Sequence, residues 1–96
     1  MSAAIQHLQF STEWTPLEIM SEPDVQLNFR GYAPYVLVKR IDTNNDFLMY
    51  ISAKSLAEQL DPLRKDNAGQ FTGLRLEIRK ESTDKFAKYE VKQYSE

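Results

Sequence analysis

The sequence predicts a mainly β fold: a five-stranded barrel with one helix between strands three and four, preceded by an N-terminal arm. Five strand-like runs cover residues 25–30, 35–41, 47–51, 74–80 and 86–93. One helix-like run, residues 55–60, falls between the third and fourth of them. The chain has 96 residues, enough for one domain with a simple core. We therefore expect an acidic arm over residues 1–24 and the barrel over residues 25–96.

The first three strands are predicted from their residue patterns. Residues 25–30 alternate apolar and polar side chains, the period-two pattern of a strand with one buried face. Residues 35–41 begin with an apolar, β-branched stretch, which is typical of a central strand. Residues 42–46 are rich in Asn and Asp, which favour turns, so the run 47–51 completes a hairpin.

The helix is predicted from a start signal and an apolar stripe. Ser55 followed by Glu58 matches a capping box, in which each side chain satisfies a free backbone amide. Leu56, Leu60 and Leu63 recur at helical spacing and form one apolar face. We expect this face to plug the bottom of the barrel.

The last two strands form a second hairpin around the turn at residues 81–84. Leu74, Leu76 and Ile78 share one face of the fourth strand and alternate with charged residues. Three strands, a helix and two strands is the order of an OB-fold barrel, a scaffold that often binds single-stranded nucleic acid. The competing interpretation is another small β-rich roll, in which the arm adds a sixth strand.

Composition argues against several classes of function. The chain has no cysteine, and no apolar run approaches the roughly 20 residues of a membrane-spanning helix. The first 24 residues lack the basic start of a secretory signal, and we expect a cytoplasmic protein. His7 is the single histidine, and no glycine-rich phosphate loop is present. The sequence therefore predicts neither an enzyme nor a bound metal or cofactor.

Charge is divided unevenly along the chain. All twelve basic residues lie between residues 30 and 92. Residues 1–24 contain four acidic residues and no basic one, whereas residues 25–93 carry a net charge of +3. A mildly basic body with an acidic arm favours an anionic partner for the body, although uneven solvated faces explain the same pattern.

Aromatic and basic residues of the two hairpins form the predicted nucleic-acid interface. A positive groove with aromatic rings is how proteins hold single strands, because phosphates pair with cations and bases stack on rings. Phe86 is the strongest candidate, since its strand neighbours on that face are lysines; alternatively it packs under the arm. About half of the aromatic residues in the first hairpin must fill the core instead. The predicted interface residues are Arg30, Tyr32, Tyr35, Lys39, Arg40, Phe47, Tyr50, Arg75, Arg79, Lys85, Phe86, Lys88 and Lys92.

Trp14 is the residue on which the alternative function, binding of a protein partner, depends. It stands between polar residues in the arm, where it is either an anchor for a protein partner or a contact within the fold. In the alternative interpretation, the protein is an interaction subunit of a larger assembly and uses the barrel together with this arm.

The chain resembles the small phage- and plasmid-type OB-fold single-stranded DNA-binding proteins. The resemblance runs through residues 35–38, the helix 55–60, and residues 74–78 and 85–91, about two-thirds of the chain. It is one of pattern, because no strict motif defines the group. The acidic arm at the front departs from it, since such proteins more often carry acidity in a C-terminal tail.

The resemblance implies a groove over strands two and three that binds single strands without sequence preference during replication or recombination. Single-stranded DNA is the expected partner, with RNA left open. A protein partner of the arm and a homo-oligomer are also left open, and no membrane contact is expected.

Overall fold

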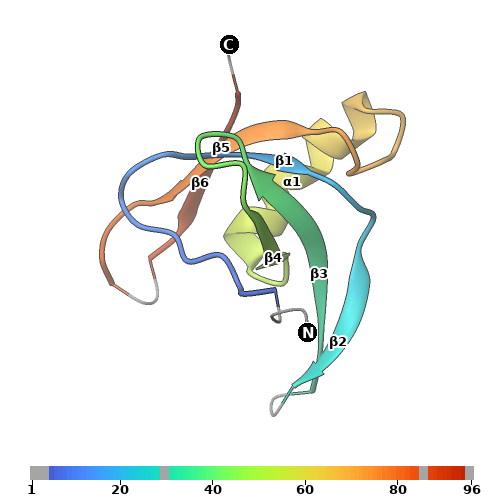
Figure 1. Ribbon diagram of the computed structural model, residues 1–96, viewed down its shortest axis with the longest axis horizontal. Coiled ribbons are helices and arrows are strands. Elements are labelled where there is room, and N and C mark those ends of the chain that lie inside the picture. Colours follow the sequence, from blue (N-terminus) through green and yellow to red (C-terminus); the bar gives the residue numbers. More distant parts are fainter. Residues whose placement is uncertain (1–4, 29–30, 85–86, 95–96) are drawn as a thin grey trace.

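The longest strand, β3 (Gly31–Arg40), organises the sheet. Two shorter strands, β1 (Thr15–Ile19) and β2 (Asp24–Asn28), pair antiparallel with successive parts of it, because Leu17 lies opposite Arg40 and Asp24 lies opposite Tyr35. Strand β4 (Asp46–Tyr50) pairs antiparallel with β3 from Lys39 back to Tyr35. The curved β3 therefore links all three strands (Figure 1).

The second half of the sheet continues from β1. Strand β5 (Arg75–Lys80) pairs antiparallel with β1, and β6 (Tyr89–Gln93) pairs antiparallel with β5. The helix α1 (Lys54–Asp66) connects β4 to β5 and lies behind the sheet in Figure 1. The structure is a computed structural model that describes residues 5–28, 31–84 and 87–94. Within these residues no helix is long and apolar enough to span a bilayer.

The core lies between the sheet and the helix. Alternate residues of β1, β3, β4 and β5 point into it, as the period-two patterns predict. Leu56 and Leu60 of α1 are buried against these strands, and Leu63 packs at the margin. The fully buried members are Leu17, Ile19, Val36, Val38, Met49, Leu56, Leu60, Leu76 and Ile78.

The predicted β-rich fold with one helix between the third and fourth predicted strands is confirmed. The prediction of a closed five-stranded barrel is wrong, because the sheet has six strands and stays open. The additional strand is β1, which comes from the range assigned to the arm and lies between β3 and β5.

Closure of the barrel would require the outer edges of β4 and β6 to pair, and both edges have other partners. On β4, the Leu48 amide donates to the Gln6 carbonyl at 2.9 Å, and the Leu8 amide donates to the Leu48 carbonyl at 2.8 Å. On β6, the Gln59 side chain of α1 donates to the Tyr89 carbonyl at 2.6 Å and accepts from the Val91 amide at 2.9 Å. Edge groups paired in this way no longer need a neighbouring strand.

The helix starts differently from the predicted capping box. Ala53 is the residue before the first turn, and no side chain caps it. Ser55 lies within the helix, and its hydroxyl oxygen accepts from the Tyr89 amide at 3.1 Å. Ser55 therefore fixes the beginning of β6 to the helix.

Candidate functional site

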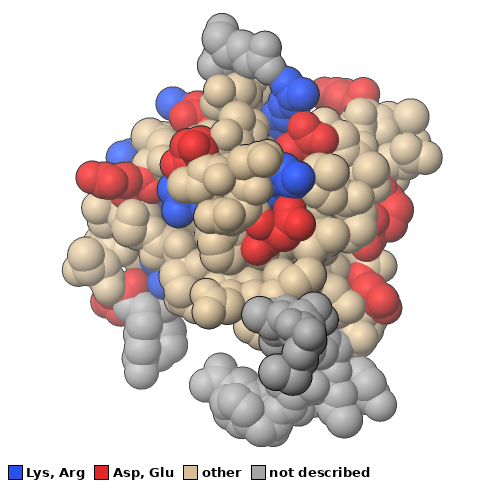
Figure 2. Space-filling model, viewed as in Figure 1, with Lys and Arg blue, Asp and Glu red and all other residues tan. Residues whose placement is uncertain are grey.

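Most described cations of the predicted interface are engaged in short ion pairs. Strand register places acids beside them: Glu18 lies opposite both Lys39 and Arg75, and Glu77 opposite Lys92. Figure 2 shows acidic and basic side chains interspersed over the visible face. Such pairs are individually weak, about 0–1 kcal/mol, but they cancel the positive field that a polyanion would meet. The pairs are Lys39–Asp46 (3.7 Å), Arg40–Asp42 (2.7 Å), Arg75–Glu18 (2.9 Å), Arg79–Glu90 (2.9 Å) and Lys92–Glu77 (3.6 Å).

Trp14 is held by two of the same cations. The Arg79 guanidinium carbon lies 4.8 Å from the centre of the indole ring, and the Lys92 ammonium lies 4.4 Å from it. The ring is half-buried. Cations over an indole face are favourable contacts. The structure therefore gives Trp14 a contact within the fold.

The aromatic residues of the first hairpin separate into two groups. Phe47 lies opposite the buried Val38 and packs against the core, as expected for about half of the set. Tyr35 and Tyr50 lie opposite each other and alternate with buried neighbours, so they point to the outer face of the sheet. Of these three residues, only Tyr35 and Tyr50 lie where a ligand could reach them.

Four predicted residues lie wholly or in part outside the described structure. Arg30, Lys85 and Phe86 lie outside the described residues. Tyr32 pairs with Leu27 through the β2–β3 ladder, and its side chain is outside the described ones. Their part in an interface stays a prediction.

Tyr50 and Lys88 are brought together at the open side of the sheet, between β4 and β6. Two adjoining hollows there share the wall residue Tyr89, and we call them together the seam groove. One has a volume of about 590 Å³ and is lined by Ala53, Lys54, Ser55, Glu58, Ala87, Lys88 and Tyr89. The other has about 260 Å³ and is lined by His7, Leu8, Gln9, Phe10, Tyr50 and Tyr89.

The smaller hollow is aromatic. The His7 ring stacks on Tyr50 with centroids 4.5 Å apart and planes 17° apart. The Phe10 ring meets Tyr89 edge-on at 5.7 Å. His7 is exposed and the other three rings are half-buried, so these rings remain partly accessible. The arrangement presents ring faces at the surface of the seam groove.

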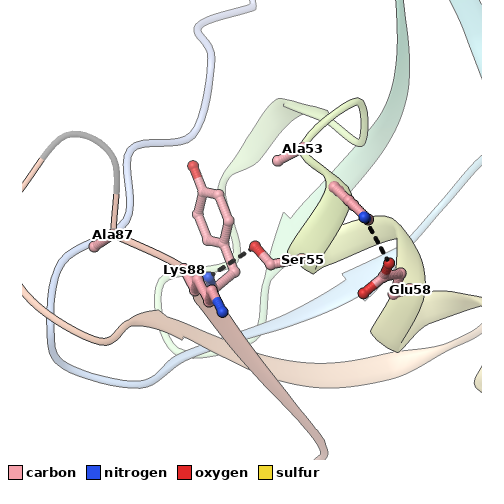
Figure 3. A pocket seen from close by; sticks show the side chains of 7 residues that line it. Ala53, Ser55, Glu58, Ala87 and Lys88 are labelled. Atoms are coloured by element: carbon pink, nitrogen blue, oxygen red, sulfur yellow. Dashed lines mark hydrogen bonds and ion pairs between the residues drawn. The ribbon is translucent and has the colours of Figure 1, made fainter.

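The larger hollow is bordered by lysines. Lys54 begins α1, and Lys88 directly precedes β6 beside Ser55 (Figure 3). Lys54 is 3.8 Å from Glu58, but both side chains are largely exposed, so this pair is weak. Lys88 is exposed and makes no ion pair with the described residues. Lys80 lines neither hollow, but its ammonium lies 5.7 Å from the centre of the ring of Tyr89, the wall residue that both hollows share.

Contacts far apart in sequence position these groups. The backbone bonds of Leu48 hold His7 beside β4, and the buried Leu8 side chain anchors the same segment. Ser55 and Gln59 hold Tyr89 through its amide and carbonyl groups. The aromatic half thus depends on the N-terminal segment, and the lysine half depends on the packing of α1 against β6.

Sequence reasoning missed His7, Phe10, Tyr89 and Lys54 as members of one site. The alternation of Leu8 and Phe10 with polar residues is a short period-two signal that could have indicated an extended segment. No local signal indicates that this segment lies against β4.

The geometry defines an accessible groove with aromatic rings at one end and lysines at the other. Comparison with known proteins found no matching family model, no matching curated protein and no matching solved structure.

Proposed function

We propose that the protein binds single-stranded nucleic acid, with DNA as the principal ligand, in the seam groove. The observation that carries the proposal is the shared wall residue Tyr89, which joins an aromatic hollow to a lysine-bordered one. Proteins that hold single strands combine these two features, because every base has a stackable face and every nucleotide a phosphate. The binding would be tolerant of sequence, since ring stacking does not read base edges.

The charges of the groove support weak to moderate binding. Lys54 and Lys88 line the larger hollow together with Glu58, which pairs weakly with Lys54, and Lys80 lies beside the shared Tyr89 ring. None of the three lysines belongs to the ion pairs on the outer face of the sheet. Three phosphate contacts on a single strand correspond to a salt slope of about −2, at roughly −0.7 per contact. Stacking of each base on a ring adds about 1–3 kcal/mol.

The strand connectivity also supports an OB-like assignment in a partly open form. OB folds are Greek-key barrels that are often incompletely closed, and they bind oligonucleotides over strands two and three and over neighbouring loops. Here β3 and β4 correspond to those strands, and the loop between β5 and β6 borders the groove through Ala87 and Lys88. A role in replication or recombination rests on the resemblance to phage and plasmid proteins alone.

The experiment is a fluorescence-anisotropy titration of labelled oligo-dT with two tyrosine variants. Tyr50→Leu removes the ring on which His7 stacks and keeps apolar volume, so the stacking column is disrupted and affinity should fall about 5- to 150-fold, the range of one base stack. Tyr35→Leu is the matched control, because Tyr35 lies directly opposite on β3 but outside the groove lining. Equal losses in both variants, or no binding by the wild-type protein, would contradict the proposal.

A second candidate function, binding of a protein partner, is favoured by one apolar row on the outer face. The row consists of Met20, Leu37 and Leu48. Met20 is 39% exposed, and its amide donates to the Leu37 carbonyl at 2.7 Å. Leu37 in turn lies opposite Leu48 across the β3–β4 pair. Leu37 and Leu48 are half-buried. Contiguous exposed apolar side chains commonly mark interaction surfaces. Met20→Lys should abolish partner capture without changing oligo-dT affinity if this function is correct.

A further inference from the structure

We infer that residues 6–10 form a built wall of the seam groove, so that single-stranded nucleic acid and this segment occupy the β4 edge together. The inference rests on the proposed function and adds that the segment and the ligand stabilise each other in the groove. A segment that merely covered the groove would compete with the ligand. A segment that supplies part of the binding surface is instead stabilised by the ligand.

The segment is anchored independently of any ligand. Gln6 and Leu8 pair with Leu48 through two backbone hydrogen bonds of 2.9 and 2.8 Å. The Leu8 side chain is only 9% exposed and belongs to the core. Beyond Phe10, the Ser11 carbonyl accepts from the Lys80 amide at 2.8 Å. Displacement of the segment would expose Leu8 and leave the Leu48 backbone groups unpaired.

The segment also supplies rings that the groove otherwise lacks. His7 covers Tyr50 with one ring face, and because the residue is exposed we assign its other, open face to the ligand. A base stacked on that open face would continue a Tyr50–His7 column. Phe10 closes the opposite side against Tyr89. His7 is therefore a binding residue of the groove, and Leu8 is the residue that positions it.

The placement of acidic residues argues against competition. Residues 5–10 contain no acid. Among the acids that follow, Glu18 pairs with Arg75, and the Glu22 carboxylate accepts from the Thr72 amide and hydroxyl group. These carboxylates contact other parts of the fold and do not line the groove. They therefore do not imitate a nucleic-acid strand within it.

Thermodynamic linkage makes the inference measurable. If the ligand binds better to the protein with a docked segment, docking and binding must strengthen each other by the same factor. Hydrogen exchange of the Leu8 and Leu48 amides reports docking directly, because both amides are bonded across the segment and β4. Saturating oligo-dT should slow the exchange of both amides in the 96-residue protein.

Variants in the same segment provide the second arm of the test. His7→Ala should weaken oligo-dT binding about tenfold, and His7→Phe should restore most of it because a ring is retained. Ile5→Ala is the control, since Ile5 is exposed and does not line the groove. Intact binding with unchanged or faster exchange at Leu8 and Leu48 overturns this inference and leaves the proposed function standing. No oligo-dT binding by the wild-type protein overturns both.

Discussion

Glu22 shows how one side chain can hold two distant segments together. Its carboxylate accepts from the Phe71 amide at 3.1 Å, from the Thr72 amide at 2.8 Å and from the Thr72 hydroxyl group at 2.6 Å. The hydrogen bond from the Thr72 side chain is the largest reason why the pKa of Glu22 lies below its ordinary value of 4.5. The link between β1 and β2 is thereby fixed to the loop before β5.

This contact predicts an acid-dependent loss of stability. Because the pKa is lower in the folded protein, the contribution is fully present above pH 4.5 and is lost as pH falls through the lowered value. Glu22→Gln should lower the melting temperature at pH 7 and flatten the decline below pH 4.5, as measured by circular dichroism. Glu13→Gln is the control for an exposed carboxylate outside the contact. Identical pH profiles for wild type and Glu22→Gln would contradict this account.

Gln59, like Glu22, links two distant segments through its side chain, in this case α1 and the edge of β6. Its amide nitrogen donates to the Tyr89 carbonyl and its oxygen accepts from the Val91 amide, as a neighbouring strand would. Gln59→Ala leaves two part-buried backbone groups unpaired, and we expect a loss of about 1–3 kcal/mol in the free energy of unfolding by urea. Gln70→Ala, at an exposed position, should change it by less than about 0.5 kcal/mol. A loss no larger than that of the control would show that α1 does not secure this edge.

At the scale of elements, patterns within one segment were sufficient for most of the sheet. The alternation in residues 74–80 placed Leu76 and Ile78 correctly, and both are fully buried. The apolar stripe of the helix likewise placed Leu56 and Leu60. Such patterns are readable because a strand or helix repeats its buried face at a fixed period.

The elements that were misread depend on partners distant in sequence. Residues 15–19 alternate as a strand, but Pro16 weakens that pattern because it lacks an amide donor. In the structure Pro16 lies opposite Glu77, and its carbonyl accepts from the Ile41 amide at 3.0 Å. Ser55 was expected to cap its own helix, yet it bonds to Tyr89. Neither partner can be inferred from local sequence.

The central position of β1 gives a direct prediction. Leu17 is completely buried between β3 and β5. Leu17→Ala should reduce the free energy of unfolding in urea by about 2–5 kcal/mol, the usual cost of such a truncation in a core. Thr12→Ala, at an exposed position before β1, should have little effect. A small effect of Leu17→Ala would mean that residues 15–19 are dispensable for the fold.

At the scale of the whole molecule, folding pairs most described cations of the predicted interface with acids, and one of these pairs crosses the charge division seen in the sequence. The acidic N-terminal part places Glu18 against Arg75 of the basic body, and further pairs neutralise Lys39, Arg79 and Lys92. Net charge per segment was readable from the sequence, but these pairings follow from strand register. The same register leaves Tyr50 and Lys88 in a groove whose other members come from the N-terminal segment and the helix.

The salt dependence of oligo-dT binding tests the central claim most directly. Measured by anisotropy between 50 and 200 mM salt, the wild type should give a slope of about −2 in log K against log salt, and Lys54→Ala/Lys88→Ala should reduce it to about −0.7. Lys39→Ala/Lys65→Ala removes the same charge from residues that pair with Asp46 and Asp61, and it should keep the wild-type slope. Equal slopes for the two double variants, or no binding at low salt, would contradict the assignment of the seam groove.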